Sequence, residues 1–424
     1  MSIIGQGVFI SGSQGGGTVE EKYINFYDYD GTLLYSYTEA EAQALSELPS
    51  VPAKEGFTIA WNYTLQEILA AGKPVNVGAD YTPTDGAVSM DMLFSDDGRI
   101  SPTFNFQISK GSMTIDWGDG STPDVVSESS IDLTEKSVSH QMQIDSYPAM
   151  FTIKMTYSGE GSYELSSGSP NVSFCPYPYH NFIINAHLPA IQYLGTTFAG
   201  CKELRSISLA PGTLYSNQSA LSDCFSLKFI SLPRGSLQIG RYCFSNCYSL
   251  KSISIPPSVT AIGEHAFDSC YALKSVSLPN SITTCGDYLF TNCELLESLW
   301  LSSRATVPRY VAYSAECLKK IIIPTGVTVL NDYAFQGLSS LDEIKIPASV
   351  TFIKYGVFNS CNYLHIIDMT DYVNESFPTL DTTLSNSGVP EDLIILVASD
   401  AKKTELSAMT NWSNYASKIQ VQGE

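Results

Sequence analysis

Ten cysteines are the side chains best able to do chemistry in this 424-residue chain, because a thiolate can act as a nucleophile or bind a metal ion. Six of them stand three residues before a leucine and follow a spacing close to 23 residues: Cys201, Cys224, Cys247, Cys270, Cys293 and Cys361. Ala315 and Leu338 fill the same position elsewhere, which indicates an apolar environment. Neighbouring turns ~4.8 Å apart would bring equivalent cysteines within the distance of a disulfide. Because equivalent side chains on stacked turns point in parallel, however, we expect buried free thiols. The sequence has no Cys-x-x-Cys pair and no histidine at a metal-binding spacing, so it indicates neither zinc nor thiol catalysis.

Carboxylates form a second group with possible chemistry. Asp28-Tyr29-Asp30-Gly31-Thr32-Leu33 resembles the nucleophile loop of haloacid-dehalogenase-type phosphatases, and Gly118-Asp119 with Asp124 resembles their magnesium-binding motif. That resemblance implies Asp28 as nucleophile, Asp30 as general acid, and Asp119 or Asp124 as a metal ligand. The ~85 intervening residues show no strand-helix succession that would build a parallel sheet, and Asp-Gly is common in hairpin turns. We therefore expect no enzyme, no metal and no cofactor, with the phosphatase as an alternative.

Cations recur with the same period as the cysteines. One column contains Arg205, Lys228, Lys251, Lys274, Glu297, Lys319, Asp342 and His365. A second column contains Ser208, Ser231, Ser254, Ser277, Trp300, Ile322, Lys345 and Asp368. The favoured interpretation of these columns is a solvated face whose lysines resist edge aggregation. The alternative is that a basic, serine-rich surface with Trp300 on an acidic protein binds an anionic cell-wall polymer or an acidic partner.

A row of rings has the same period: Tyr242, His265, Tyr288 and Tyr333. Each precedes a pair of positions expected to be buried. Packing between neighbouring turns is the favoured interpretation of this row, and a platform for stacking sugars is the alternative.

An internal repeat must position all these columns. Leucines stand at steps of 23 residues, with one step of 22: Leu204, Leu227, Leu250, Leu273, Leu296, Leu318, Leu341 and Leu364. This regular period predicts a solenoid whose turns bury their apolar residues only by stacking. Prolines such as Pro256 and Pro279 end each short strand, because proline cannot donate to a ladder. Residues 304–313 depart from the pattern, so we expect a bulge or kink there.

The unit from Cys247 to Phe267, CYSLKSISIPPSVTAIGEHAF, resembles the bacterial surface-antigen (BspA-like) type of leucine-rich repeat. The resemblance covers about 180 residues. It implies the fold strongly and the function only weakly, because such repeats present surfaces to many proteins and glycans. We therefore expect a mainly β protein with a leucine-rich-repeat solenoid over 176–370.

Four further segments flank the repeats. Residues 1–18 form a Gly-rich arm, and 19–88 read as a small α+β module with a hairpin whose turn is at Tyr29–Thr32 and a capping box from Thr38 to Glu41. Residues 89–175 alternate as strands, and Trp117-Gly118-Asp119-Gly120-Ser121 is similar to the hallmark of the polycystic-kidney-disease (PKD) type of immunoglobulin-like sandwich. We expect a tight turn there, with calcium at Asp116 and Asp119 as the alternative. The two modules are expected to act as spacers, and 371–424 to form an α/β cap on the solenoid.

Composition narrows the functional classes. The formal charge is −20, and 181–370 carry 13 basic against 12 acidic residues, so the sequence argues against nucleic-acid binding. No apolar run approaches the ~20 residues of a membrane span, and residues 1–17 lack the features of a signal peptide.

The order of modules resembles tail-associated prophage proteins of gut Firmicutes. That resemblance implies a non-catalytic virion protein, assembled in the cytoplasm, that presents its repeats to a bacterial surface glycan or protein or to neighbouring virion proteins. A bacterial cell-surface adhesin is the alternative. The candidate ligand-binding residues are Arg205, Lys228, Lys251, Lys274, Trp300 and Lys319.

Overall fold

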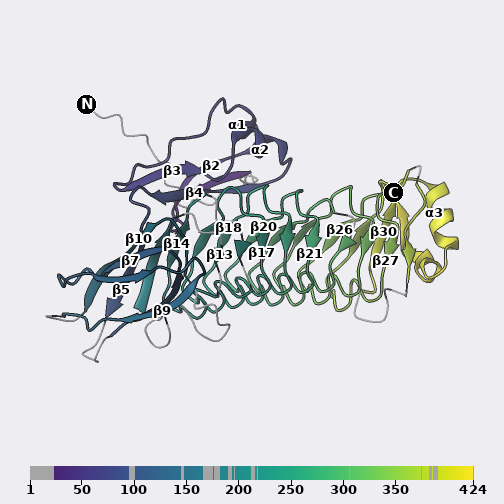
Figure 1. The fold of residues 1–424 in the computed structure, drawn as a ribbon. Helices are drawn as coiled ribbons and strands as arrows, with labels where there is room; N and C mark the ends of the chain where they lie inside the picture. The colour runs from purple at the N-terminus through teal and green to yellow at the C-terminus, as the bar shows by residue number, and fades with distance from the viewer. Residues whose placement is uncertain are drawn as a thin grey trace.

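A computed structural model shows an elongated solenoid with two smaller modules at one end and a helical cap at the other (Figure 1). The structure describes residues 23–94, 101–144, 148–165, 175, 182–189, 193–194, 196–211, 215–216, 218–304, 306–373, 375–381, 384 and 390–423. The Gly-rich arm lies outside them. No helix in these ranges is long and apolar enough to cross a membrane.

The first module is a four-stranded sheet with two short helices, and its longest strand, over 75–83, was not predicted. Its elements are β1 (Ile24–Tyr27), β2 (Leu33–Tyr37), α1 (Glu39–Gln43), β3 (Phe57–Trp61), α2 (Leu65–Ala70) and β4 (Val75–Pro83), in the sheet order β2-β1-β4-β3. The predicted capping box of Thr38 and Glu41 is present at α1. Phe26, Ile68 and Val77 are buried in a hydrophobic cluster separate from the core of the remaining chain.

The second module is a β-sandwich. One sheet contains β5 (Val88–Phe94), β7 (Gly111–Asp116), β8 (Asp124–Glu128) and β10 (Ala149–Gly159), and the other contains β6 (Thr103–Ile108), β9 (Thr134–Ser139) and β11 (Tyr163–Glu164). Strand β12 (Ile183–Leu188) pairs antiparallel with β5 and parallel with β14 (Ser206–Leu209), the first strand of the solenoid face. Sandwich and solenoid therefore share a sheet and a hydrophobic core.

Two parallel ladders build the solenoid. The face that we call the strand face carries β14, β16 (Phe229–Ser231), β18 (Ser252–Ser254), β20 (Ser275–Ser277), β22 (Ser298–Trp300), β24 (Lys320–Ile322), β26 (Glu343–Lys345) and β28 (Ile366–Asp368). Parallel pairing joins β16 to β18, β20 to β22 and β24, and β26 to β28. The second ladder comprises β13 (Tyr193–Leu194), β15 (Tyr215–Ser216), β17 (Gln238–Ile239), β19 (Ala261–Ile262), β21 (Thr284–Cys285), β23 (Thr306–Val307), β25 (Val329–Leu330), β27 (Phe352–Ile353) and β29 (Thr379–Leu380). The repeat leucines are fully buried between the ladders, which confirms the predicted solenoid.

The predicted irregularity lies in the second ladder, whose pairing stops at β21 and resumes at β23. Arg304 bridges the gap, because its guanidinium donates to the Cys285 carbonyl at 3.0 Å and to Thr306 Oγ1 at 3.3 Å. The side chain thus replaces part of the backbone bonding that the shorter turn loses.

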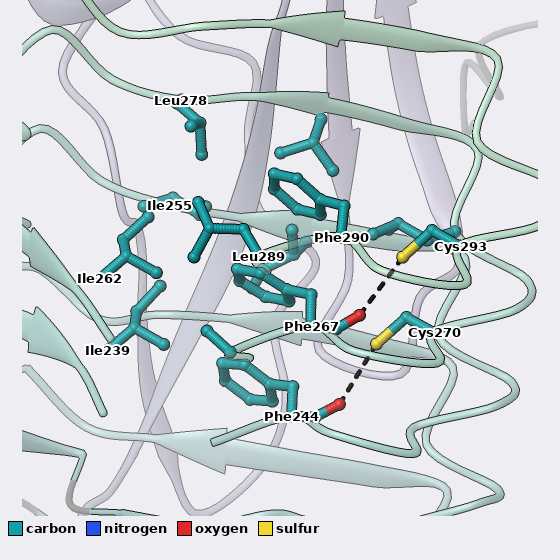
Figure 2. Close-up of a cluster of buried hydrophobic side chains, with 14 of the residues drawn as sticks. Ile239, Phe244, Ile255, Ile262, Phe267, Cys270, Leu278, Leu289, Phe290 and Cys293 are labelled. Atoms are coloured by element: carbon teal, nitrogen blue, oxygen red, sulfur yellow. Dashed lines mark hydrogen bonds between the residues drawn. The ribbon is translucent and has the colours of Figure 1, made fainter. Parts of the chain in front are cut away.

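The repeated cysteines are buried free thiols, as expected. Each bonded thiol donates to a backbone carbonyl of the preceding turn; Cys270 donates to Phe244 and Cys293 to Phe267, both at 3.2 Å (Figure 2). Burial raises the pKa of these thiols well above its usual value. A raised pKa keeps the thiolate fraction low, so the cysteines serve packing and not catalysis.

The C-terminal segment closes the end of the solenoid. Strands β30 (Ile394–Val397) and β31 (Ile419–Val421) extend the strand face, and helix α3 (Asp400–Ala408) and the 3₁₀ helix η3 (Trp412–Lys418) connect them. Trp412 is buried and donates its indole N–H to the Pro378 carbonyl at 2.8 Å. Ile419 begins the last strand, directly after η3.

Candidate functional site

The strand face is divided between a covered part and an open part. The first module lies on its N-terminal half, above β14 to β20 (Figure 1). The serines of the second column are therefore buried beneath β4, where Ser208 donates to the Tyr81 carbonyl at 3.4 Å, Ser231 to Asp80 Oδ1 at 2.9 Å and Ser254 to the Asn76 carbonyl at 2.6 Å. The module is a cover on this face, which corrects the expectation of a spacer.

Close backbone approach explains the small residues at this contact. A Cβ added to Gly78 would lie 2.3 Å from Ser231 Oγ, and one added to Gly31 would lie 2.7 Å from Phe229 Cβ. Gly31 also has φ +86°, a left-handed conformation that favours glycine. The Asp28–Leu33 segment is thus a hairpin turn that packs against Phe229.

The carboxylates of that turn bind backbone. Asp28 accepts from the Tyr29 N–H and Asp30 from the Thr32 N–H, at 2.8 and 2.9 Å. Asp119 and Asp124 lie in the other module, at the β7–β8 turn. The fold therefore keeps the two halves of the phosphatase-like motif in separate modules.

The predicted cations remain exposed beside the covered face. Arg205, Lys228, Lys251 and Lys274, which we call the basic strip, stand one turn apart just before their strands, and Lys319 follows beyond Glu297. None of these five cations has a carboxylate within 4.0 Å among the residues that the structure describes. Trp300 is separate from them: it is 7 % exposed and lies where the module ends, with Lys320 Nζ 5.4 Å from its ring centroid.

Comparisons with known proteins concern the solenoid. Residues 170–297 and 237–365 match the family model described as BspA type leucine rich repeat region. The chain carries a leucine-rich repeat region of the BspA type. The matching class is a non-enzymatic repeat class, and the match concerns the repeats alone. No curated protein matches the chain.

Solved structures of leucine-rich repeat proteins also match. A leucine-rich repeat protein from Bacteroides ovatus is 22% identical over 53% of this chain and 66% of its own, with a TM-score of 0.39. A leucine rich cell surface protein from Faecalibacterium prausnitzii is 19% identical over 55% and 84%, with a TM-score of 0.28. The pneumococcal vaccine antigen PcpA is 17% identical over 59% and 83%, with a TM-score of 0.30.

The predicted row of rings in the leucine-rich repeats is a continuous stack. Tyr242, His265, Tyr288, Tyr310 and Tyr333 have centroids 4.6 to 5.1 Å apart and interplanar angles of 15° or less. Each inner ring therefore has both faces covered by its neighbours, which agrees with packing between turns and leaves no open platform for a sugar. Tyr310 was missed in the sequence because its turn is one residue shorter.

The Trp117–Ser121 segment is a turn that holds the sandwich core. Trp117 packs between Phe104 and His140, at centroid distances of 5.4 and 4.8 Å, and donates to Asp124. Asp119 accepts from His140 Nε2 at 3.0 Å and from the N–H groups of Ser121 and Gln143. These bonds hold the Asp119 pKa at about 2 despite burial. The side chains that calcium would require are engaged in the turn; similarity to the PKD type remains a prediction.

A buried carboxylate makes docking of the first module depend on pH. Burial raises the Asp80 pKa from 3.8 to about 8, while hydrogen bonds from Ser231 and Arg234 oppose the rise. Between pH 6.5 and 8 an undocked Asp80 has lost its proton, whereas a docked one keeps most of it until the pH nears 8. Docking therefore weakens as pH rises, by at most about tenfold per unit. His187, with its pKa lowered by burial to about 4, and Lys73, lowered by burial to about 8, titrate mainly outside this window.

We expect hydrogen exchange under the module to accelerate from pH 6.5 to 8, after correction for intrinsic exchange. The Asp80→Asn variant should lose this slope. A slope of the same size in Asp80→Asn would show that another group controls docking.

Proposed function

We propose that the protein is a surface recognition protein that binds an anionic envelope polymer along the basic strip. The observation that carries this proposal is a line of four exposed cations without carboxylate partners on a chain of formal charge −20. Parallel strands place successive turns ~4.8 Å apart, so the four charges repel one another. A linear polymer with regularly spaced phosphates or carboxylates would relieve that repulsion at several turns together.

Location at a bacterial cell surface is the form of this proposal that we favour. Among the similar structures, one is named a cell surface protein and another a vaccine antigen. A tail-associated virion protein would use the same strip, and it remains the alternative on the order of modules alone. Mass spectrometry of washed envelopes and of purified particles from an induced culture separates the two: enrichment in the envelope supports the adhesin, and enrichment with tail proteins supports the virion component.

Binding to a synthetic poly(glycerol phosphate) tests the strip directly. In the strip variant, Arg205, Lys228, Lys251 and Lys274 are all replaced by glutamine, and we expect at least tenfold weaker binding in about 0.1 M salt and a smaller salt dependence. The matched control replaces Lys110, Lys154, Arg241 and Arg309, which are exposed but paired with carboxylates. Both variants change the formal charge by the same four units.

Surface ion pairs contribute little to stability, so the control variant should remain folded. It should bind within about threefold of the unmodified chain. Equal loss in the two variants would mean that only total charge matters, and absence of binding by the unmodified chain would refute the proposed ligand class.

A further inference from the structure

A pocket lies at the boundary between the first module and the open strand face. It has a volume of about 480 Å³ and is lined by residues from both bodies: Tyr23, Glu39 and Lys73 belong to the module, and Asn280, Trp300 and Ile322 belong to the repeats. Neither body encloses this space alone. The pocket therefore exists only in the docked arrangement, and sequence analysis of separate segments could not reveal it.

The tryptophans distinguish this pocket from the rest of the protein. The chain has four, and three donate their indole N–H within the fold: Trp61 to the Pro49 carbonyl at 2.7 Å, Trp117 to Asp124 at 2.8 Å and Trp412 to the Pro378 carbonyl at 2.8 Å. Trp300 is 7 % exposed, but its indole N–H has no acceptor among the described residues. This N–H is not one of the fully buried polar atoms that lack a partner, so solvent reaches it and it is available to donate to a ligand in the pocket.

The lining offers complementary groups around that donor. Lys73 has its ammonium engaged by the carbonyls of Leu278 and Leu301 and by Asn280 Oδ1 at 2.9 Å, so it holds the module in place. Glu39, by contrast, has an exposed carboxylate without an ion pair among the described residues, and it lines the pocket together with Tyr23. Ile322, 41 % exposed, gives the pocket an apolar side on the strand face.

We propose that this pocket binds one saccharide unit of an envelope glycan. Alternating C–H and hydroxyl groups of a pyranose match the mixture of apolar side chains and hydrogen-bonding groups. The Trp300 indole N–H donates to a ring or hydroxyl oxygen, and the Glu39 carboxylate accepts from sugar hydroxyls. This inference deepens the proposed function, on which it rests for the class of partner, but it uses a site separate from the basic strip.

Calorimetric titration of the full chain tests this site. The probes are cellotriose, xylotriose, mannotriose and tri-N-acetylchitotriose, each at millimolar concentration, with tryptophan fluorescence as a second readout. We expect at least one trisaccharide to bind. Trp300→Phe keeps an aromatic ring without the donor and should weaken that binding about tenfold. Glu39→Gln removes the charged acceptor and should weaken it by tenfold or more.

Matched controls separate this inference from the proposed function. Glu47→Gln makes the same change at an exposed residue of the same module outside the pocket and should leave binding unchanged. The strip variant should bind the trisaccharide normally even if it no longer binds poly(glycerol phosphate). The inference is overturned if no trisaccharide binds, if Glu39→Gln and Glu47→Gln behave alike, or if the strip variant loses the trisaccharide. Because Glu39 lies on another element from Trp300, its variant keeps the test valid should Trp300→Phe fold poorly.

Discussion

Replacement of Phe267 by alanine should lower the free energy of unfolding of the solenoid by about 3–5 kcal/mol. Phe267 is fully buried and stacks between Phe244 and Phe290, at centroid distances of 5.4 and 5.2 Å, in the middle of the repeats (Figure 2). The loss combines the transfer energy of the ring with the cavity that it leaves. Adjacent turns cannot collapse into that cavity, because the parallel ladders fix their spacing.

Chemical denaturation measures this loss, with Tyr271→Ala as the matched control. Tyr271 lies four residues along the same turn, stacks on Tyr248 at 4.9 Å and is 37 % exposed. An exposed aromatic pair contributes about 1 kcal/mol, so the control should lose much less stability than Phe267→Ala. Equal losses in the two variants would contradict a core in which neighbouring turns support one another.

The solenoid could be predicted because its physical cause is local and repeated. Leu250, Ile253 and Phe267 occupy positions whose equivalents recur 23 residues away, so each inward side chain is visible in the sequence as one member of a column. Prolines mark strand ends for a reason that does not depend on tertiary structure. The altered turn at Arg304 was predictable for the same reason, as a departure from a known period.

Docking of the first module could not be predicted, because it depends on contacts between residues far apart in the chain. The column of Ser208, Ser231 and Ser254 looks like a solvated surface when the repeats are considered alone. Its small hydroxyls in fact receive strand β4, and the column becomes bulky at Trp300, where the cover ends. The change from serine to tryptophan in this column was the one feature of the sequence that indicated the cover, and it marks where the covered part of the strand face ends.

The candidate binding residues include some that could be predicted from the repeat and one whose surroundings depend on docking of the first module. The basic strip was predicted from periodicity, and its residues are exposed as a line beside the cover. Trp300 was predicted as part of the same surface, but the fold places it in a pocket together with Glu39 and Tyr23, more than 250 residues earlier in the chain. These side chains lie together only because the first module docks on the strand face.

A methyl group at Gly78 should release the first module from the strand face. The Cβ of Gly78→Ala would lie 2.3 Å from Ser231 Oγ and 2.4 Å from Ser231 Cβ, and these atoms sit on the ladder of the solenoid, which cannot yield. Overpacking of this kind costs typically about 1–3 kcal/mol. The module has its own hydrophobic cluster, so the cost should fall on docking while the module itself remains folded.

Hydrogen exchange measures the release, which should accelerate exchange in β16 and β18 and leave β26 and β28, outside the covered part, unchanged. The double variant Gly78→Ala with Ser231→Gly removes the two closest atoms and leaves Ser231 Cα at 3.2 Å, so it should partly restore protection relative to Gly78→Ala. Ser231→Gly alone controls for the lost hydrogen bond to Asp80. Unchanged protection in Gly78→Ala would mean that the interface adapts, and the pocket at Trp300 would then depend on a more flexible contact than the close approach of β4 implies.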